Sequence, residues 1–179
     1  MKATGIVRRI DDLGRIVIPK EIRRTMRIRE GDPLEIYTDR EGEVIFKKYS
    51  PIGELTAFAA QYAETLHKTC DLAVVICDRD AVIACAGLPK RDFTDKPLSP
   101  ELEELISARS LYVAAGEKAA KVTAEGEEAF TVAYMMPIIT EGDIAGCVAT
   151  LRPAAEASVD LSRESTEAKL VATAAAFLG

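Results

Sequence analysis

Seven arginines lie within the first 29 residues of the chain, and they are the side chains best suited to bind a charged partner. A guanidinium is planar and always charged, and it pairs bidentately with phosphate oxygens or with the O6/N7 edge of guanine. The cluster therefore indicates a surface for nucleic acid, although arginines that only solvate a basic face give the same local charge. The seven are Arg8, Arg9, Arg15, Arg23, Arg24, Arg27 and Arg29.

The charge of the chain is divided unevenly. The 179 residues carry a net charge of −6, yet residues 1–50 hold 12 Lys and Arg against 9 Asp and Glu. Residues 51–179 hold 11 against 20, so the first part has a balance of +3 and the second a balance of −9. This asymmetry favours a module that faces nucleic acid, joined to an acidic part with another task.

Short elements must position these arginines. Residues 4–10 and 15–18 have the β-branched, apolar character of strands, and the Asp and Gly residues at 11–14 are typical of a turn between them. Pro19 ends the second strand and suits the first turn of a helix, because proline has no N–H to lose there. The sequence therefore predicts two strands, followed by a short helix over residues 20–26.

A Gly-Asp-Pro break at residues 31–33 leads into two further predicted strands, 34–38 and 44–48, which form a hairpin. Four short strands and one stub of helix make a poor core, and domains of this size usually rely on disulfides, a metal or oligomerisation. The first cysteine is Cys70 and the one histidine is His67. Oligomerisation is therefore expected for the first fifty residues.

This N-terminal stretch resembles the AbrB-like DNA-binding domain, the swapped-hairpin fold shared by transition-state regulators and MazE-type antitoxins. The resemblance implies a β-rich barrel in which two chains interleave their hairpins, which makes an obligate homodimer through residues 1–50. It also implies binding to double-stranded DNA. The residues that carry the resemblance are Thr4-Gly5-Ile6-Val7-Arg8, Leu13-Gly14-Arg15-Ile16-Val17-Ile18-Pro19, Glu21-Ile22-Arg23-Arg24, Gly31-Asp32 and Leu34-Glu35-Ile36.

The resemblance also assigns the DNA contacts. For the other three arginines of the cluster, solvation of a basic face is the favoured interpretation. Which of the assigned arginines meets a base edge and which meets a phosphate is left open. The positions that contact DNA in that family each carry arginine here, at Arg8, Arg15, Arg23 and Arg24.

A helix opens the second part of the chain. Residues 51–68 are predicted as a linker helix and as the first helix of this part, with Ser50 as its N-cap. Its apolar residues follow steps of three and four, which predicts a seam that packs on its own domain or on a partner's copy. The seam consists of Ile52, Leu55, Ala59, Tyr62 and Leu66.

The remaining elements alternate between strands and helices. A helix with Ser99 as N-cap is predicted to end near Arg109, and a last helix over residues 162–178 has Leu170, Ala174, Phe177 and Leu178 as its predicted buried edge. Strands are predicted over residues 72–77, 81–87, 130–136 and 144–151.

This order predicts an α+β domain over residues 55–179, with an antiparallel sheet and flanking helices. It resembles a GAF-type sensor domain, in which the first and last helices pack side by side and commonly dimerise. Joined to the dimer of residues 1–50, such a domain implies a homotetramer that presents two DNA-binding dimers. The two domains together resemble a family of gene regulators from endospore-forming bacteria, which implies an activator and repressor of sporulation genes.

GAF-type domains hold ligands between the sheet and the connections that correspond to residues 93–109 and 111–122 here. One interpretation is a small-molecule effector, with Lys90, Arg91 and Arg109 as candidate anion anchors in place of ordinary surface charge. The other is an empty domain that serves only to dimerise. No cofactor is predicted.

Catalytic arrangements are disfavoured by the composition. His67 and Cys70 are only two ligands and do not make a zinc site, and Cys77 and Cys85 lie in apolar strand patterns typical of a core. No catalytic residue and no metal site are therefore predicted, and the protein is not expected to be an enzyme. The least favoured alternative is a GAF-type methionine sulfoxide reductase that depends on Cys77, Cys85 or Cys147.

An antitoxin-like interaction protein is the other alternative, with a partner that binds the C-terminal half. Antitoxins of that family usually carry a short disordered tail, and the folded pattern here argues against this alternative. No run approaches the roughly 18–20 apolar residues of a membrane-spanning helix. The start of the chain has no apolar signal region, so a cytoplasmic location without a membrane partner is expected.

Overall fold

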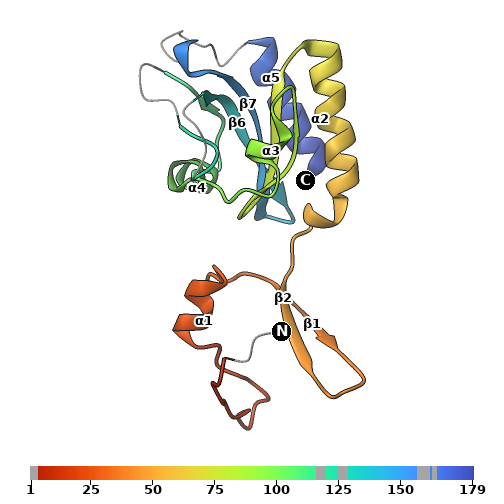
Figure 1. The fold of residues 1–179 in the computed structure, drawn as a ribbon, viewed down its shortest axis with the longest axis vertical. Coiled ribbons are helices and arrows are strands. Elements are labelled where there is room, and N and C mark those ends of the chain that lie inside the picture. Colours follow the sequence, from red (N-terminus) through yellow and green to blue (C-terminus); the bar gives the residue numbers. More distant parts are fainter. Residues whose placement is uncertain (1–3, 116–119, 125–128, 157–161, 163–164) are drawn as a thin grey trace. The chain divides into compact units, whose positions relative to one another are not determined.

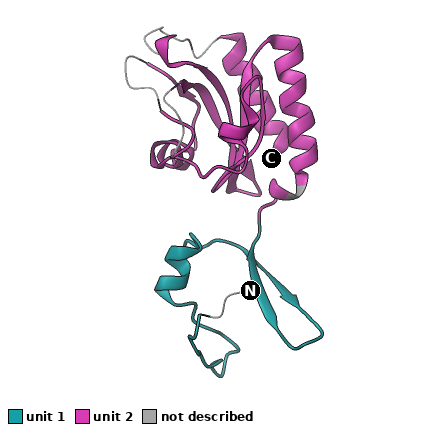
Figure 2. Ribbon diagram, viewed as in Figure 1, with its two compact units in different colours: residues 1–49 teal, residues 50–179 magenta. Residues whose placement is uncertain are grey.

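The computed structural model describes residues 4–115, 120–124, 129–156, 162 and 165–179. These residues belong to two compact units, Met1–Tyr49 and Ser50–Gly179, drawn in teal and magenta in Figure 2. The second unit contains most of the helices and strands, and the first contains one helix and one hairpin.

The N-terminal unit is built around a helix and a two-stranded hairpin. Helix α1 spans Lys20–Thr25 and begins directly after Pro19, as predicted. Strand β1, Leu34–Thr38, pairs antiparallel with β2, Val44–Lys48 (Figure 1), which confirms the predicted hairpin. Asp39 closes the turn, because its Oδ1 accepts hydrogen bonds from the backbone N–H groups of Glu41 and Glu43 at 3.0 and 2.8 Å.

The strands predicted over residues 4–10 and 15–18 are wrong for the single chain, because neither stretch forms a strand. A strand requires ladder hydrogen bonds to a neighbour, and the described residues of this chain supply none to these two stretches. The β-branched side chains that suggested strands are solvent-exposed instead, as at Val7 and Val17.

The N-terminal unit buries almost no core of its own. Among residues 4–49 only Pro19 is buried. Exposed apolar surface of this extent is typical of a protein interface. The exposed large apolar side chains are Ile6, Val7, Ile10, Leu13, Ile16, Val17, Met26, Ile36, Tyr37, Val44, Phe46 and Tyr49.

A five-stranded antiparallel sheet forms the centre of the C-terminal unit, with the strand order β4–β3–β7–β6–β5. The two longest strands, β6 and β7, form a hairpin across Glu141 and Gly142. Strand β3 pairs with β7 along its whole length, from Ala73 opposite Leu151 to Asp78 opposite Gly146. The strands are β3 Ala73–Asp78, β4 Val82–Ala86, β5 Tyr112–Val113, β6 Phe130–Thr140 and β7 Asp143–Pro153.

Helices cover both faces of this sheet. Helices α2, Thr56–Cys70, and α5, Thr166–Leu178, lie side by side on one face (Figure 1). Helices α3, Lys90–Phe93, and α4, Pro100–Ser107, pack on the other. Successive side chains of β3 alternate between the two cores, with Val74 and Ile76 under α2 and α5 and with Val75 and Cys77 under α3 and α4. The predicted α+β domain with an antiparallel sheet is confirmed.

The first helix of this unit starts later than predicted. A 3-10 turn at Gly53–Leu55 precedes α2, and the Oγ of Ser50 accepts a hydrogen bond from the Gly53 N–H at 3.0 Å. Ser50 therefore caps the 3-10 turn and not α2. In the predicted seam, Ile52, Ala59 and Leu66 are buried but Leu55 is 46% exposed, because α2 has only one face against the sheet.

The last two predicted helices are present, with one error in the buried edge. Ser99 caps α4 and accepts from the Leu102 N–H at 3.0 Å, as predicted. Helix α5 begins at Thr166 after the N-cap Ser165, while residues 163–164 lie outside the described residues. Phe177, predicted as buried, is 64% exposed, and its ring lies against the rings of Phe58 and Tyr62 of α2.

Two further observations concern a short turn and the lengths of the helices. A short 3-10 turn, Ala154–Glu156, follows β7. In the part of the chain that the structure describes, no helix has both the length and the apolar character needed to cross a bilayer.

Candidate nucleic-acid interface and oligomer surface

A tight loop presents Arg15, and Asp11 organises it. The Oδ1 of Asp11 accepts from the backbone N–H groups of Leu13 and Arg15 at 3.0 and 2.8 Å, and its Oδ2 accepts from the Nε of Arg15 at 2.8 Å. Two backbone hydrogen bonds close the loop at 3.0 Å, from Gly14 N–H to Asp11 O and from Asp11 N–H to Arg15 O. Gly14 adopts a φ of +77°, which favours glycine.

The contacts of Asp11 also fix its charge. The pKa of its carboxyl is lowered, first by the backbone hydrogen bond from Arg15 and then by the hydrogen bond from the Arg15 side chain. The sequence identified Asp11 only as a turn residue. An acidic residue four positions before an arginine, with a glycine between them, was the available signal.

Arg23 and Arg24 lie next to each other in the last turn of α1, and both are exposed. Pro19 positions this helix, because its carbonyl accepts from the Arg23 N–H at 3.0 Å. Arg8 lies in the exposed segment before the Asp11 loop. The four assigned arginines thus lie on three local structures of one unit, and only Arg23 and Arg24 share an element.

Arg27 and Arg29 take part in the structure of the unit. Arg27 has a φ of +51°, and its carbonyl accepts from the Nζ of Lys48 on β2 at 3.0 Å. The Arg29 N–H donates to Oδ2 of Asp32 at 2.8 Å. These contacts connect the end of α1 to the hairpin.

A second surface lies on the outer side of α2 and α5. Tyr62 of α2 stacks on Phe177 of α5, with ring centroids 5.6 Å apart, and Phe58 lies 5.8 Å from Phe177. Phe58 is 41% exposed, and Leu55 continues the exposed apolar stripe toward the start of α2. We call Leu55, Phe58, Tyr62 and Phe177 the aromatic cluster. The predicted seam on the first helix included Leu55 and Tyr62, but it left out Phe58, and Phe177 was wrongly predicted to be buried.

The three candidate anion anchors, Lys90, Arg91 and Arg109, do not come together in one site. Lys90 on α3 pairs with Glu64 of α2 at 3.4 Å, while Arg109 donates to the carbonyl of Gly142 at 2.7 Å. Arg91 is exposed on α3. Lys90 thus joins two helices, and Arg109 holds the turn between β6 and β7.

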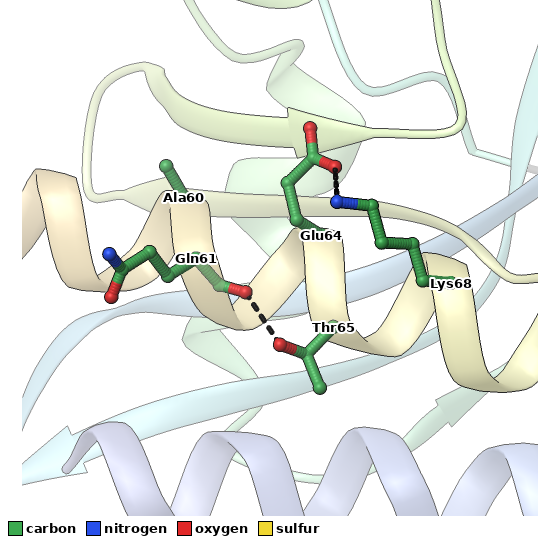
Figure 3. Close-up of a pocket in the computed structure, with 5 residues that line it drawn as sticks. All are labelled: Ala60, Gln61, Glu64, Thr65 and Lys68. Carbon is green, nitrogen blue, oxygen red and sulfur yellow. Dashed lines mark hydrogen bonds and ion pairs between the residues drawn. The ribbon is translucent and has the colours of Figure 1, made fainter.

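Two hollows lie near these elements. A shallow groove of about 490 Å³ runs along α2 between Ala60 and Lys68 (Figure 3), where Glu64 pairs with Lys68 at 3.4 Å. Hydrogen bonds from Lys68 and then from Lys90 lower the pKa of Glu64. A cavity of about 650 Å³ lies at α4, lined among others by Glu101, Tyr112 and Lys121.

The space between the sheet and α4 is filled by apolar side chains. Phe93, Leu98, Leu102 and Ile106 pack there against the sheet. Apolar side chains thus occupy part of the region predicted for an effector pocket, while the cavity at α4 is lined by residues from both of the predicted connections.

Three of the four cysteines are buried in this same core, at Cys77, Cys85 and Cys147. Cys77 and Cys147 face each other across β3 and β7. The pKa of the Cys77 thiol is raised well above its ordinary value, first by the hydrogen bond with Cys147 and then by burial. Among the residues described, no group of three or more His, Cys, Asp or Glu could hold a metal ion.

Comparison with known proteins gave matches to two family models. Residues 54–179 match the family described as stage V sporulation protein T C-terminal, transcription factor. Residues 7–53 match the family described as antidote-toxin recognition MazE, bacterial antitoxin. The two matches divide the chain close to the boundary between its two units.

Stage V sporulation protein T of Bacillus subtilis (strain 168) is 49% identical over 178 residues, which cover 99% of this chain and 97% of that protein. The transition state regulatory protein AbrB of the same organism is 63% identical over 51 residues, or 28% of this chain and 52% of AbrB. A crystal structure of a methyl-accepting chemotaxis protein, residues 122 to 287, has a TM-score of 0.53 at 17% identity. It covers 70% of this chain and 87% of that chain, and the likeness is one of fold alone.

Proposed function

The chain belongs to the stage V sporulation protein T family, and we propose that it is a sequence-specific DNA-binding regulator that activates some sporulation genes and represses others. The observation that carries this proposal is the 49% identity to stage V sporulation protein T along 99% of the chain. The description of the matched C-terminal family as a transcription factor agrees with it. Because such a regulator acts on chromosomal DNA, we place it in the cytoplasm.

We assign DNA binding to residues 1–50 and regulation and oligomerisation to residues 55–179. The 63% identity of the N-terminal stretch to AbrB supports the first assignment. Arg8, Arg15, Arg23 and Arg24 are the proposed DNA contacts, and all four are exposed. A base-edge contact by one of them contributes roughly 1–3 kcal/mol of discrimination, and a phosphate contact adds affinity that depends on salt but not on sequence.

The N-terminal unit is proposed to form a homodimer. Its lack of a buried core supports this, since Pro19 alone is buried among residues 4–49. Residues 4–10 and 15–18 have strand-like sequences and no strand partner among the described residues of their own chain. A second chain that interleaves with the first would supply both the missing ladders and the missing core.

The aromatic cluster is proposed to join two such dimers into a homotetramer. Aromatic side chains are enriched in the buried centre of protein interfaces, and here Phe58 and Phe177 are exposed on neighbouring helices, with Tyr62 stacked on Phe177. A tetramer carries two DNA-binding dimers, so avidity adds to the affinity of each.

For regulation, an empty GAF-like domain that dimerises is better supported than one with a bound effector, because apolar side chains fill the space between the sheet and α4. The specific observation that favours an effector is the cavity at α4, where Lys121 is a cation among the lining residues. Lys90, Arg91 and Arg109 line neither this cavity nor the groove on α2.

We propose no catalytic role. Burial of Cys77, Cys85 and Cys147, together with the raised pKa of Cys77, argues against the reactive thiolate that a methionine sulfoxide reductase needs. The match to the MazE family favours the antitoxin alternative, but it ends at residue 53. The residues beyond it form a folded unit and not a short tail.

The test of the proposal combines selection and mass measurement. The full chain is incubated with a random-sequence duplex library, and the bound DNA is amplified over several rounds. A sequence-specific regulator enriches a defined motif in this selection. In a separate pull-down from cells, an antitoxin-like protein would copurify a small toxin. Light scattering of the same sample should give a multiple of the 19.4 kDa chain mass, and the mass of a single chain would overturn the proposed oligomer.

A further inference from the structure

We propose that Asp11 is a positioning residue that holds Arg15 for a bidentate contact with a base edge and thereby sets the sequence specificity of the DNA contact. This inference rests on the proposed function of residues 1–50. It assigns Asp11 a role that acts through Arg15 and requires no contact between Asp11 and DNA.

The geometry around Asp11 engages both of its carboxylate oxygens. One oxygen binds two backbone N–H groups of the loop, at Leu13 and Arg15, and the other binds the Nε of the Arg15 side chain at 2.8 Å. The same residue therefore shapes the loop and grips the guanidinium that the loop presents. Asp12, its neighbour, has no side-chain hydrogen bond or ion pair with any described residue.

The hydrogen bond from Nε to Asp11 leaves the two Nη groups of the Arg15 guanidinium available for DNA. The Nε is engaged, and the ion pair with Asp11 leaves the Arg15 side chain 70% exposed. The two Nη groups form the outer edge of the fork, which is the edge that pairs with O6 and N7 of guanine. A side chain already held in place loses less rotamer freedom when it binds, which improves affinity for the DNA that fits it.

The carboxylate also weakens the part of the binding that does not depend on sequence. A fixed negative charge beside the contact repels phosphates of every sequence alike. An aspartate is charged at neutral pH, and the hydrogen bonds from Arg15 lower the pKa of Asp11 further. This repulsion lowers specific and non-specific affinity alike, so the discrimination assigned to Asp11 comes from its hold on the Arg15 side chain.

The test compares Asp11→Asn with Asp12→Asn, which removes the same formal charge from the next residue. The probes are the duplex enriched by the wild-type full chain and a scrambled duplex of equal length and composition. An Asn at position 11 keeps an oxygen for the loop N–H groups, but its amide cannot accept from the Arg15 Nε. Circular dichroism and native mass establish that each variant keeps the fold and the oligomer.

We expect both variants to bind the scrambled duplex somewhat more tightly than the wild type. For Asp11→Asn alone we expect the ratio of specific to non-specific affinity to fall about tenfold, the order of one base-edge contact. In an Arg15→Lys background the same change should lower the ratio no further, because lysine has no fork to position. A structural role of Asp11 would instead lower the ratio in both backgrounds.

The outcomes separate the two proposals. If the wild type enriches no motif and binds both duplexes alike, the proposed function and this inference both fall. If the wild type discriminates but Asp11→Asn and Asp12→Asn have equal ratios, the role of Asp11 is overturned and the proposed function stands. An equal loss in the Arg15→Lys background would likewise overturn positioning through Arg15.

Discussion

Truncation of Phe177 is expected to split the proposed tetramer while leaving the chain folded. A phenylalanine side chain that is fully buried removes roughly 150–250 Å² from water. With Phe177 64% exposed, on the order of 130 Å² remains to be covered by a partner, which corresponds to about 3 kcal/mol per chain at 25 cal/mol per Å². That loss weakens the dimer–dimer dissociation constant by more than about a hundredfold.

The same substitution should cost the single chain little. Within one chain Phe177 contacts Tyr62 and Phe58 through ring pairs at 5.6 and 5.8 Å, and such pairs contribute about 0.5–1.5 kcal/mol beyond area burial. Truncation of a buried residue such as Leu102 should cost about 2–5 kcal/mol. The Phe177→Ala variant should therefore melt only slightly below the wild type.

Sedimentation velocity from nanomolar to micromolar concentration measures the effect. The wild type should sediment as four chains of 19.4 kDa and Phe177→Ala as two. Glu104→Ala, an exposed position on α4 across the sheet, is the control and should stay a tetramer. A Phe177→Ala variant that remains a tetramer over the whole range would refute the assignment of the aromatic cluster, and a dimeric wild type would refute the tetramer itself.

Three further predictions concern the core, the sheet and the loop. In native protein only the exposed Cys70 should react quickly with a thiol reagent, because the other three thiols are buried and the pKa of Cys77 is raised; four fast thiols would contradict this. Gly146→Ala should lower the free energy of unfolding by about 3 kcal/mol or more, measured in urea, because a Cβ there overlaps the carbonyl oxygen of Cys77 on β3. The pKa of Asp11 lies below its usual 3.8 in the folded chain. The carboxylate that holds Arg15 is therefore fully present above pH 3.8, and it is lost only as the pH falls through the lower pKa of the folded chain. DNA discrimination at about pH 5 should accordingly equal that at neutral pH, and a decline already at pH 5 would show that another group controls it.

The elements predicted correctly from the sequence are those that neighbouring residues alone specify. Pro19 before α1 and Ser99 before α4 are helix-start signals that depend only on neighbouring residues, and both helices begin where these residues indicate. The hairpin of β1 and β2 was predicted in the same way, from two apolar runs around a Gly-containing turn. The pairing of β3 with β7 joins segments some seventy residues apart, and no local pattern specifies it.

Other predictions failed where a side chain depends on a partner. Residues 4–10 and 15–18 have strand-like composition, but a strand requires a neighbour, and the part of the chain that the structure describes supplies none. Phe177 has the periodicity of a buried helix position, and periodicity does not distinguish burial against one's own sheet from burial against a second molecule. The role of Asp11 was missed because turn chemistry alone accounts for an Asp before Gly14.

The central claim is that the arginines of the N-terminal unit read DNA, and a mobility shift tests it most directly. The wild type, Arg15→Ala and Arg23→Ala are titrated against the enriched duplex at moderate salt, with native mass measured on each. We expect both variants to keep the oligomer and to lose operator affinity by roughly 1–3 kcal/mol where a base edge is contacted. Affinity equal to that of the wild type in both variants, with the oligomer intact, would contradict the account.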